Sequence, residues 1–173
     1  MQRIVVFVVL GGLALVAGCQ RSGSNEGTNA APSSPAASPS AAPAAAAFDH
    51  PSYSVGLEPV GSYKKGEASS FKIVVRTKGE FHINEEYPTK FSATASPGVQ
   101  YAMPKLARAA QPDAFALKPC ASGKDNCTLE LTVKFTPEQT GTVQIGGELS
   151  VGVCNKDNCL FEKKTLSMPV PVG

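Results

Sequence analysis

The sequence predicts an all-β fold, an antiparallel β-sandwich of about seven to eight strands over residues 48–173. Three observations support this prediction. Apolar and polar residues alternate along several short segments, turn-forming residues separate these segments, and no segment has the 3.6-residue apolar period of a helix. Residues 106–110 could form one helical turn at most. Many short strands with frequent turns are typical of immunoglobulin-like sandwiches, and a small barrel is the alternative.

The two strongest strands define the expected core. Residues 128–135 alternate strictly, and residues 143–153 keep one apolar parity over a longer run. Further strands are expected at 53–57, 71–76, 90–95, 99–103 and 165–170. Because alternate side chains of a strand point to the same face, we expect six residues of the two strongest strands to be buried between two sheets: Leu129, Leu131, Val133, Ile145, Leu149 and Val151. The glycine pair Gly146 and Gly147 inside the longer run predicts a bulge or a kink.

Residues 1–18 have the pattern of an export signal. Arg3 precedes thirteen apolar or glycine residues at positions 4–16, which are too few to span a bilayer. Small residues at 16–18 then precede Cys19. This ending resembles the lipobox of bacterial lipoproteins, which implies cleavage before Cys19 and attachment of a diacylglycerol to its sulfur. An ordinary secretory signal is the alternative.

Residues 19–47 form a predicted tether. After Cys19 the segment is rich in Ala, Ser and Pro and has no aromatic or branched aliphatic residue. Such a composition cannot bury enough apolar surface to offset the entropy lost on ordering, so we expect a disordered arm. The membrane is the expected partner through the lipid anchor. By resemblance to the enterobacterial sorting rule, Gln20 favours the outer membrane, with the protein facing the periplasm.

The domain contains four cysteines in two closely spaced pairs, Cys120 with Cys127 and Cys154 with Cys159. Export favours disulfides, and each pair flanks a turn-rich segment that could bring its two ends within bonding distance. We therefore expect local pairing, although three connectivities are possible. A zinc site of four thiolates is disfavoured, because paired zinc ligands usually have two to four residues between them. Here six residues separate one pair of cysteines and four separate the other.

The run from Gly147 to Leu160, followed by an apolar strand, resembles the end of the periplasmic N-terminal domain of DsbD-type thiol:disulfide interchange proteins. Residues 81–91 loosely match the family's stretch before its second large strand. The resemblance implies an immunoglobulin-like sandwich with a redox pair on its last hairpin, here Cys154 and Cys159. It also implies that Cys159 is the leaving and later resolving thiol.

The sequence departs from that family in three ways. The two prolines that often follow the second cysteine are absent, and residues 113–115 are the nearest candidate for the family's cap loop. The family's transmembrane electron-relay domain has no counterpart here, so electrons would come from a separate thiol–disulfide partner in the periplasm. The pair Cys120 and Cys127 is not part of the motif, and we expect it to be structural.

Two functions remain open: a thiol–disulfide exchange module, and a non-catalytic envelope binding or scaffold lipoprotein with two structural disulfides. Sixteen basic against fourteen acidic residues argue against nucleic acid as a partner. The two histidines, His50 and His82, are too few for most metal sites. No phosphate-binding loop or nucleophile elbow is present, so we expect no small-molecule cofactor and no hydrolase or transferase activity.

The first prediction concerns the anchor. We expect the mature protein to begin at lipidated Cys19 and to partition with the membrane, because the two ester-linked chains of the diacylglycerol and one amide-linked chain on the new N-terminus exceed what stable anchoring requires. Intact mass spectrometry and membrane fractionation of wild type and a Cys19→Ala variant test this. An unmodified mature N-terminus, or an unchanged membrane fraction in the variant, would contradict it.

Overall fold

A computed structural model describes residues 45–123 and 125–173. The expectations for the signal segment 1–18, for lipidated Cys19 and for the tether up to residue 44 lie outside these residues. Within the described part, no helix is long and apolar enough to cross a bilayer. The chain forms a short 3₁₀ helix, η1 (Pro112–Ala114), and the following strands: β1 (Ala47–His50), β2 (Tyr53–Pro59), β3 (Ser69–Thr77), β4 (His82–Ile83), β5 (Lys90–Ala93), β6 (Val99–Tyr101), β7 (Lys105–Ala107), β8 (Phe115–Pro119), β9 (Asn126–Pro137), β10 (Gly141–Cys154) and β11 (Cys159–Val172).

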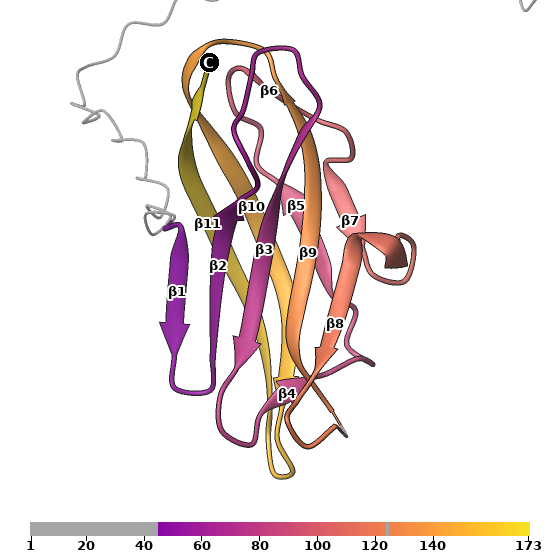
Figure 1. The fold of residues 1–173 in the computed structure, drawn as a ribbon. Coiled ribbons are helices and arrows are strands. Elements are labelled where there is room, and N and C mark those ends of the chain that lie inside the picture. The colour runs from indigo at the N-terminus through magenta and orange to yellow at the C-terminus, as the bar shows by residue number, and fades with distance from the viewer. Residues whose placement is uncertain (1–44, 124) are drawn as a thin grey trace, which may run out of the picture. The chain divides into compact units, whose positions relative to one another are not determined.

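The strands form two sheets that pack face to face as a sandwich, which confirms the predicted fold class (Figure 1). One sheet has the order β1-β2-β3-β9-β6, and β8 pairs with the same edge of β9 below β6. The other has the order β11-β10-β5-β7, and β4 also pairs with β10. All these strand pairs are antiparallel. Two of the longest strands, β9 and β10, pair directly with several shorter ones: β9 with β3, β6 and β8, and β10 with β4 and β5.

The predicted core is confirmed. All six expected residues of β9 and β10 are at most 1% exposed. They pack with aromatic rings from both sheets, such as Phe71 of β3, which meets Phe91 of β5 edge-on at 6.5 Å between ring centres. Burial of this set supplies the hydrophobic free energy that holds the two sheets together.

The structure corrects several boundaries. Pairing begins at Ala45, which bridges Leu166, so residues 45–47 belong to the domain and not to the tether. Strand β11 begins at Cys159 instead of residue 165. The segment 106–110, for which one helical turn at most was expected, ends β7 and then makes a single turn, in which the N–H groups of Ala110 and Gln111 donate to the carbonyl oxygen of Ala107. Strands β1, β4, β7 and β8 were not predicted, and for β4 and β7 the reason is that two or three residues are too few to show alternation.

The predicted bulge at Gly146 and Gly147 is wrong for the β10–β11 pairing, because the register runs through both residues without a shift. The two glycines instead permit close approach of neighbouring backbones. An added Cβ on Gly147 would lie 2.2 Å from the carbonyl oxygen of Ser92, and one on Gly146 would lie 2.0 Å from that of Leu166. Gly146 also has φ +150°, which L side chains rarely adopt.

Truncating the core at Leu131 should destabilise the domain strongly. Leu131 is fully buried and lies between Ile73 of β3 and Phe115 of β8 in the sheet. We expect Leu131→Ala to lower the free energy of unfolding by about 2–5 kcal/mol, measured by urea denaturation. Lys134→Ala, an exposed site on the same strand, is the control and should change it by less than about 0.5 kcal/mol. A loss below about 0.5 kcal/mol for Leu131→Ala would contradict this core assignment.

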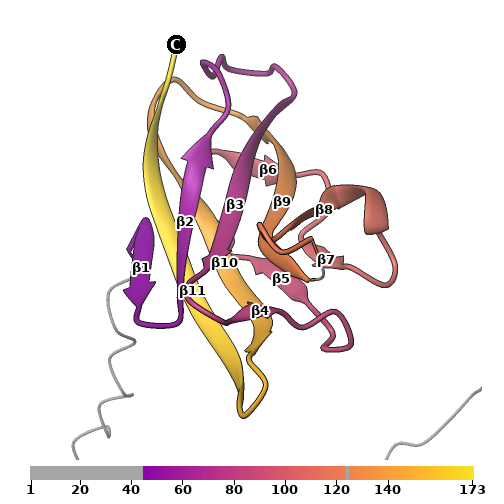
Figure 2. The ribbon, with the colours of Figure 1, turned by 60° about the horizontal axis from the view of Figure 1, so that its bottom comes forward.

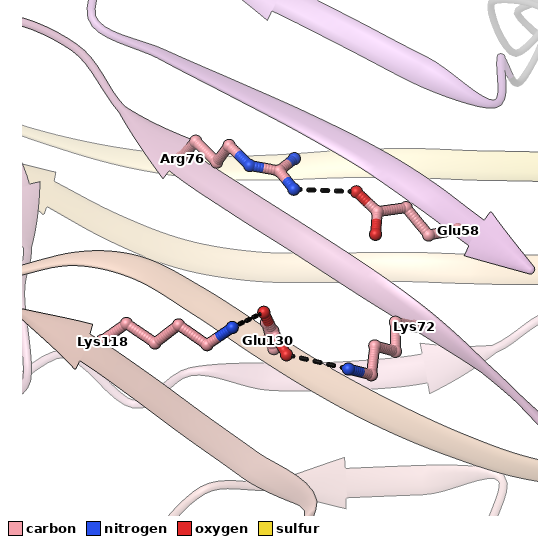
Figure 3. Close-up of polar contacts among 5 residues, drawn as sticks. All are labelled: Glu58, Lys72, Arg76, Lys118 and Glu130. Atoms are coloured by element: carbon pink, nitrogen blue, oxygen red, sulfur yellow. Dashed lines mark hydrogen bonds and ion pairs between the residues drawn. The ribbon is translucent and has the colours of Figure 1, made fainter. Parts of the chain in front are cut away.

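Ion pairs link neighbouring strands of the six-stranded sheet (Figure 3). The carboxylate of Glu130 on β9 binds Lys118 of β8 with one oxygen and Lys72 of β3 with the other, the latter at 3.0 Å. Arg76 of β3 donates to Glu58 of β2 at 2.9 Å. The hydrogen bonds from Lys118 and Lys72 hold the pKa of Glu130 below its ordinary value of 4.5.

Glu130 should make stability depend on pH. The pKa of Glu130 is lower in the folded state than in the unfolded state. The ionised carboxylate therefore stabilises the fold fully at pH values above the unfolded-state pKa, and this stabilisation is lost as the pH falls through the folded-state pKa. We expect wild type to be more stable than Glu130→Gln at neutral pH, and the difference to shrink at pH values below about 4.5. Urea denaturation of both proteins at several pH values measures it. A difference that does not change with pH would contradict the ionic role of Glu130.

Candidate functional site

The disulfide Cys154–Cys159 closes the hairpin between β10 and β11. Cys154 ends β10, Cys159 begins β11, and the two residues are direct partners with their Cα atoms 4.1 Å apart. The side-chain oxygen of Asn155 accepts the N–H groups of Asp157 at 3.0 Å and Asn158 at 2.7 Å. This asparagine turn makes the short connection and places the cysteines opposite each other, as the sequence predicted.

The two cysteines have unequal surroundings. Cys154 is 5% exposed, because it lies between β11 on one side and β4 on the other, where His82 is its partner. Cys159 is exposed at the start of β11. A partner thiolate would therefore reach Cys159 more readily than Cys154.

Asn84 directs a side-chain N–H at the disulfide. Its Oδ1 accepts the backbone N–H groups of Glu86 at 2.9 Å and Tyr87 at 3.2 Å, which fixes the orientation of the amide. Its Nδ2 consequently points to the sulfurs, 3.2 Å from Sγ of Cys154 and 4.0 Å from Sγ of Cys159. Sequence reasoning assigned no role to Asn84, although an asparagine directly after a short strand is a common turn signal.

Residues 84–87, which we call the Asn84 loop, lie against the hairpin. The ring of Tyr87 stacks on Phe161 of β11, with 4.8 Å between ring centres, and Phe161 remains 59% exposed. Gly152 of β10 makes room for the loop, because an added Cβ there would lie 2.8 Å from Cβ of Tyr87. The candidate cap segment 113–115 lies elsewhere, in η1 and at the start of β8, and Phe115 is buried opposite Leu131.

The charged residues of β11 are engaged with one another and with β10. Lys164 lies 3.0 Å from the carboxylate of Glu162, and Lys163 lies 4.0 Å from that of Glu148. The hydrogen-bond donor that the structure places at Cys154 is the neutral amide of Asn84.

The second disulfide, Cys120–Cys127, closes the loop between β8 and β9, with its Cα atoms 4.8 Å apart. Its pairing agrees with the prediction. Sγ of Cys127 lies 3.7 Å from the carbonyl oxygen of Phe81, the residue before β4. The β8–β9 loop, β4 and the β10–β11 hairpin lie at the same end of the sandwich (Figure 1).

The described part of the chain contains no cluster of side chains suited to a metal ion. Residues 45–123 and 125–173 contain no group of three or more His, Cys, Asp and Glu side chains that could hold a metal ion. His82 contributes its backbone to the β4–β10 pairing, and the imidazole of His50 accepts the N–H of Ser52 at 3.1 Å. We take the disulfide Cys154–Cys159 with the Asn84 loop as the candidate functional site, because it combines a buried cysteine, an exposed cysteine and a fixed amide donor.

No family model matches this chain, and no curated protein matches it either. Among solved structures, the chain is similar to AggA, the major subunit of aggregative adherence fimbriae type I from Escherichia coli. The likeness has a TM-score of 0.34 and 14% sequence identity, and it covers 70% of this chain and 95% of that one. At this TM-score it carries no argument about function. None of these comparisons bears on the resemblance to DsbD-type domains, which stays a prediction.

Proposed function

We propose that this protein is a lipid-anchored module of the cell envelope that exchanges its Cys154–Cys159 disulfide with the thiols of a partner protein. The observation that carries the proposal is the asymmetry of the two sulfurs. Cys159 is exposed to an incoming thiolate, whereas Cys154 is buried and lies 3.2 Å from the amide nitrogen of Asn84. A structural bridge requires no such division of exposure and hydrogen bonding.

The exchange follows ordinary thiol–disulfide chemistry. A thiolate of the partner attacks Sγ of Cys159, forms a mixed disulfide with it, and expels Cys154 as a thiolate that keeps the electron pair of the broken S–S bond. The N–H of Asn84 stabilises this negative charge. A second thiolate of the partner then attacks the partner's sulfur atom in the mixed disulfide, forms a disulfide within the partner and expels Cys159 as a thiolate. The partner leaves as a disulfide, and this protein has gained two electrons.

This order reverses the expectation from the family resemblance that Cys159 leaves first. Burial of Cys154 hinders attack at its sulfur, and the Asn84 amide favours its departure. The reduced pair could then pass its electrons to a substrate disulfide by the same steps in reverse. Lipidation of Cys19 and the tether 19–44 would keep these reactions near the membrane, on the periplasmic face of the outer membrane.

The second candidate function is a non-catalytic envelope scaffold in which both disulfides are structural. The observation in its favour is the tight integration of Cys154, which is buried and has a strand partner on each side. In this function the bridge, which joins the last pair of the β10–β11 ladder, would open only when the surrounding strands open. The two functions therefore differ in whether Cys154–Cys159 can be reduced in the folded protein.

Graded reduction separates them. Folded protein is incubated with increasing concentrations of reduced glutathione, alkylated and analysed by peptide mapping. We expect Cys154 and Cys159 to be labelled before Cys120 and Cys127, at concentrations that leave the protein folded by circular dichroism. Labelling of Cys120 and Cys127 first, or no labelling before global unfolding, would contradict the exchange function and favour the scaffold.

Two matched variants test the order of attack. In Cys154→Ser the exposed Cys159 is left alone, and in Cys159→Ser the buried Cys154 is left alone. With oxidised glutathione as the probe, we expect the mixed disulfide to form at least about tenfold faster on Cys159 than on Cys154, because access limits the reaction. Equal rates, or a faster reaction at Cys154, would show that the order is wrong.

A further inference from the structure

The segment 81–87, which contains β4 and the Asn84 loop, connects the two disulfides. On one side, its residue His82 pairs with Cys154. On the other side, the carbonyl oxygen of Phe81 lies 3.7 Å from Sγ of Cys127. In Figure 2, β4 runs past the β10–β11 hairpin and toward the end of the molecule where β8 and β9 are joined. A displacement of Cys120–Cys127 would thus move residues that contact Cys154–Cys159.

A second link joins the disulfide loop to the Asn84 loop directly. Asn126, the residue before Cys127, donates from Nδ2 to the Glu85 carboxylate at 2.6 Å. Arg108, in the turn after β7, binds the same glutamate. Its Nη1 lies 3.6 Å from the second carboxylate oxygen of Glu85, and its Nη2 donates to the backbone carbonyl oxygen of Glu85. Glu85 is thereby fixed between two partners, next in the chain to Asn84.

The Cys120–Cys127 bridge closes the loop that ends in Asn126. The regular pairing of β8 with β9 shifts its register between Lys118 and Pro119, so the ladder is already irregular where Asn126 begins β9. Beyond this point the disulfide and the hydrogen bond from Cys120 N–H to the Asp125 carbonyl at 2.7 Å hold the loop closed. Opening the bridge would let the loop ends separate, because an unlinked turn at the end of a ladder frays easily.

We infer that Asn126, held in place by the Cys120–Cys127 disulfide, is a positioning residue that keeps the Asn84 amide at the sulfur of Cys154. The inference rests on the proposed exchange function and gives the second disulfide a part in it. With Asn126 or its bridge removed, Glu85 loses a partner and the Asn84 loop is free to move from the hairpin. Cys154 then becomes a poorer leaving group, and its thiol ionises less readily because the N–H that stabilises its thiolate is gone.

The test combines Asn126→Ala and Asn84→Ala in a double-mutant cycle on the full chain. The first measurement is the rate at which reduced glutathione opens Cys154–Cys159. The second is the pKa of the Cys154 thiol in a Cys159→Ser background, from the pH dependence of alkylation of its peptide. Each single variant should slow opening by about threefold to tenfold and raise that pKa, since a hydrogen bond to a charged group is lost or misplaced. The double variant should be no slower than Asn84→Ala alone, because Asn126 acts through Asn84.

Controls separate positioning from general loosening. Ser122→Ala lies in the same disulfide loop, at an exposed residue, and should leave both measurements unchanged. The double variant Cys120→Ala/Cys127→Ala should reproduce the effect of Asn126→Ala. If it does not fold, the double-mutant cycle with Asn126→Ala still tests the inference, because that cycle keeps both disulfides. Asn126→Ala with the wild-type rate and the wild-type thiol pKa would overturn the inference alone. A wild-type Cys154–Cys159 bridge that never opens in the folded protein would overturn both the inference and the exchange function.

Discussion

The uninterrupted pairing of β10 with β11 is the constraint on which the rest of the structure depends. Each strand has 14 residues, and the register runs from Gly141 opposite Val172 to Cys154 opposite Cys159. A shift by one residue would turn every side chain of β10 to the other face and would separate the cysteines. The same strand pairs through its second edge with β5 and β4, and the β4 pairing places the Asn84 loop next to Cys154.

The candidate site lies where a rigid ladder meets a loop held by side chains. The ladder fixes the positions of both sulfurs, and Gly152 leaves the space in which Tyr87 packs. The loop contributes the polar group, and its internal hydrogen bonds decide which end of the Asn84 amide faces Cys154. Rigid supports of this kind are what a thiol site needs, because a hydrogen bond stabilises a thiolate only at a fixed distance and orientation.

The two disulfides have different relations to the sheets. Cys154–Cys159 joins partners that are already held by the pairing of two long strands, so it adds little constraint to the fold. Cys120–Cys127 closes a loop beyond an irregular point of the β8–β9 ladder. This difference agrees with a structural part for the second bridge and leaves the first available for chemistry.

The sequence by itself determined the all-β class, the six core residues of β9 and β10 and the local cysteine pairing, because alternation and turn chemistry are encoded over short distances. Tertiary structure alone decided strands β1, β4, β7 and β8, the unbroken register through Gly146 and Gly147, and the unequal exposure of Cys154 and Cys159. It also brought Asn84 to a cysteine 70 residues away and Asn126 to Glu85. Such contacts depend on how separate strands align across a sheet, and no local pattern in the sequence records that alignment.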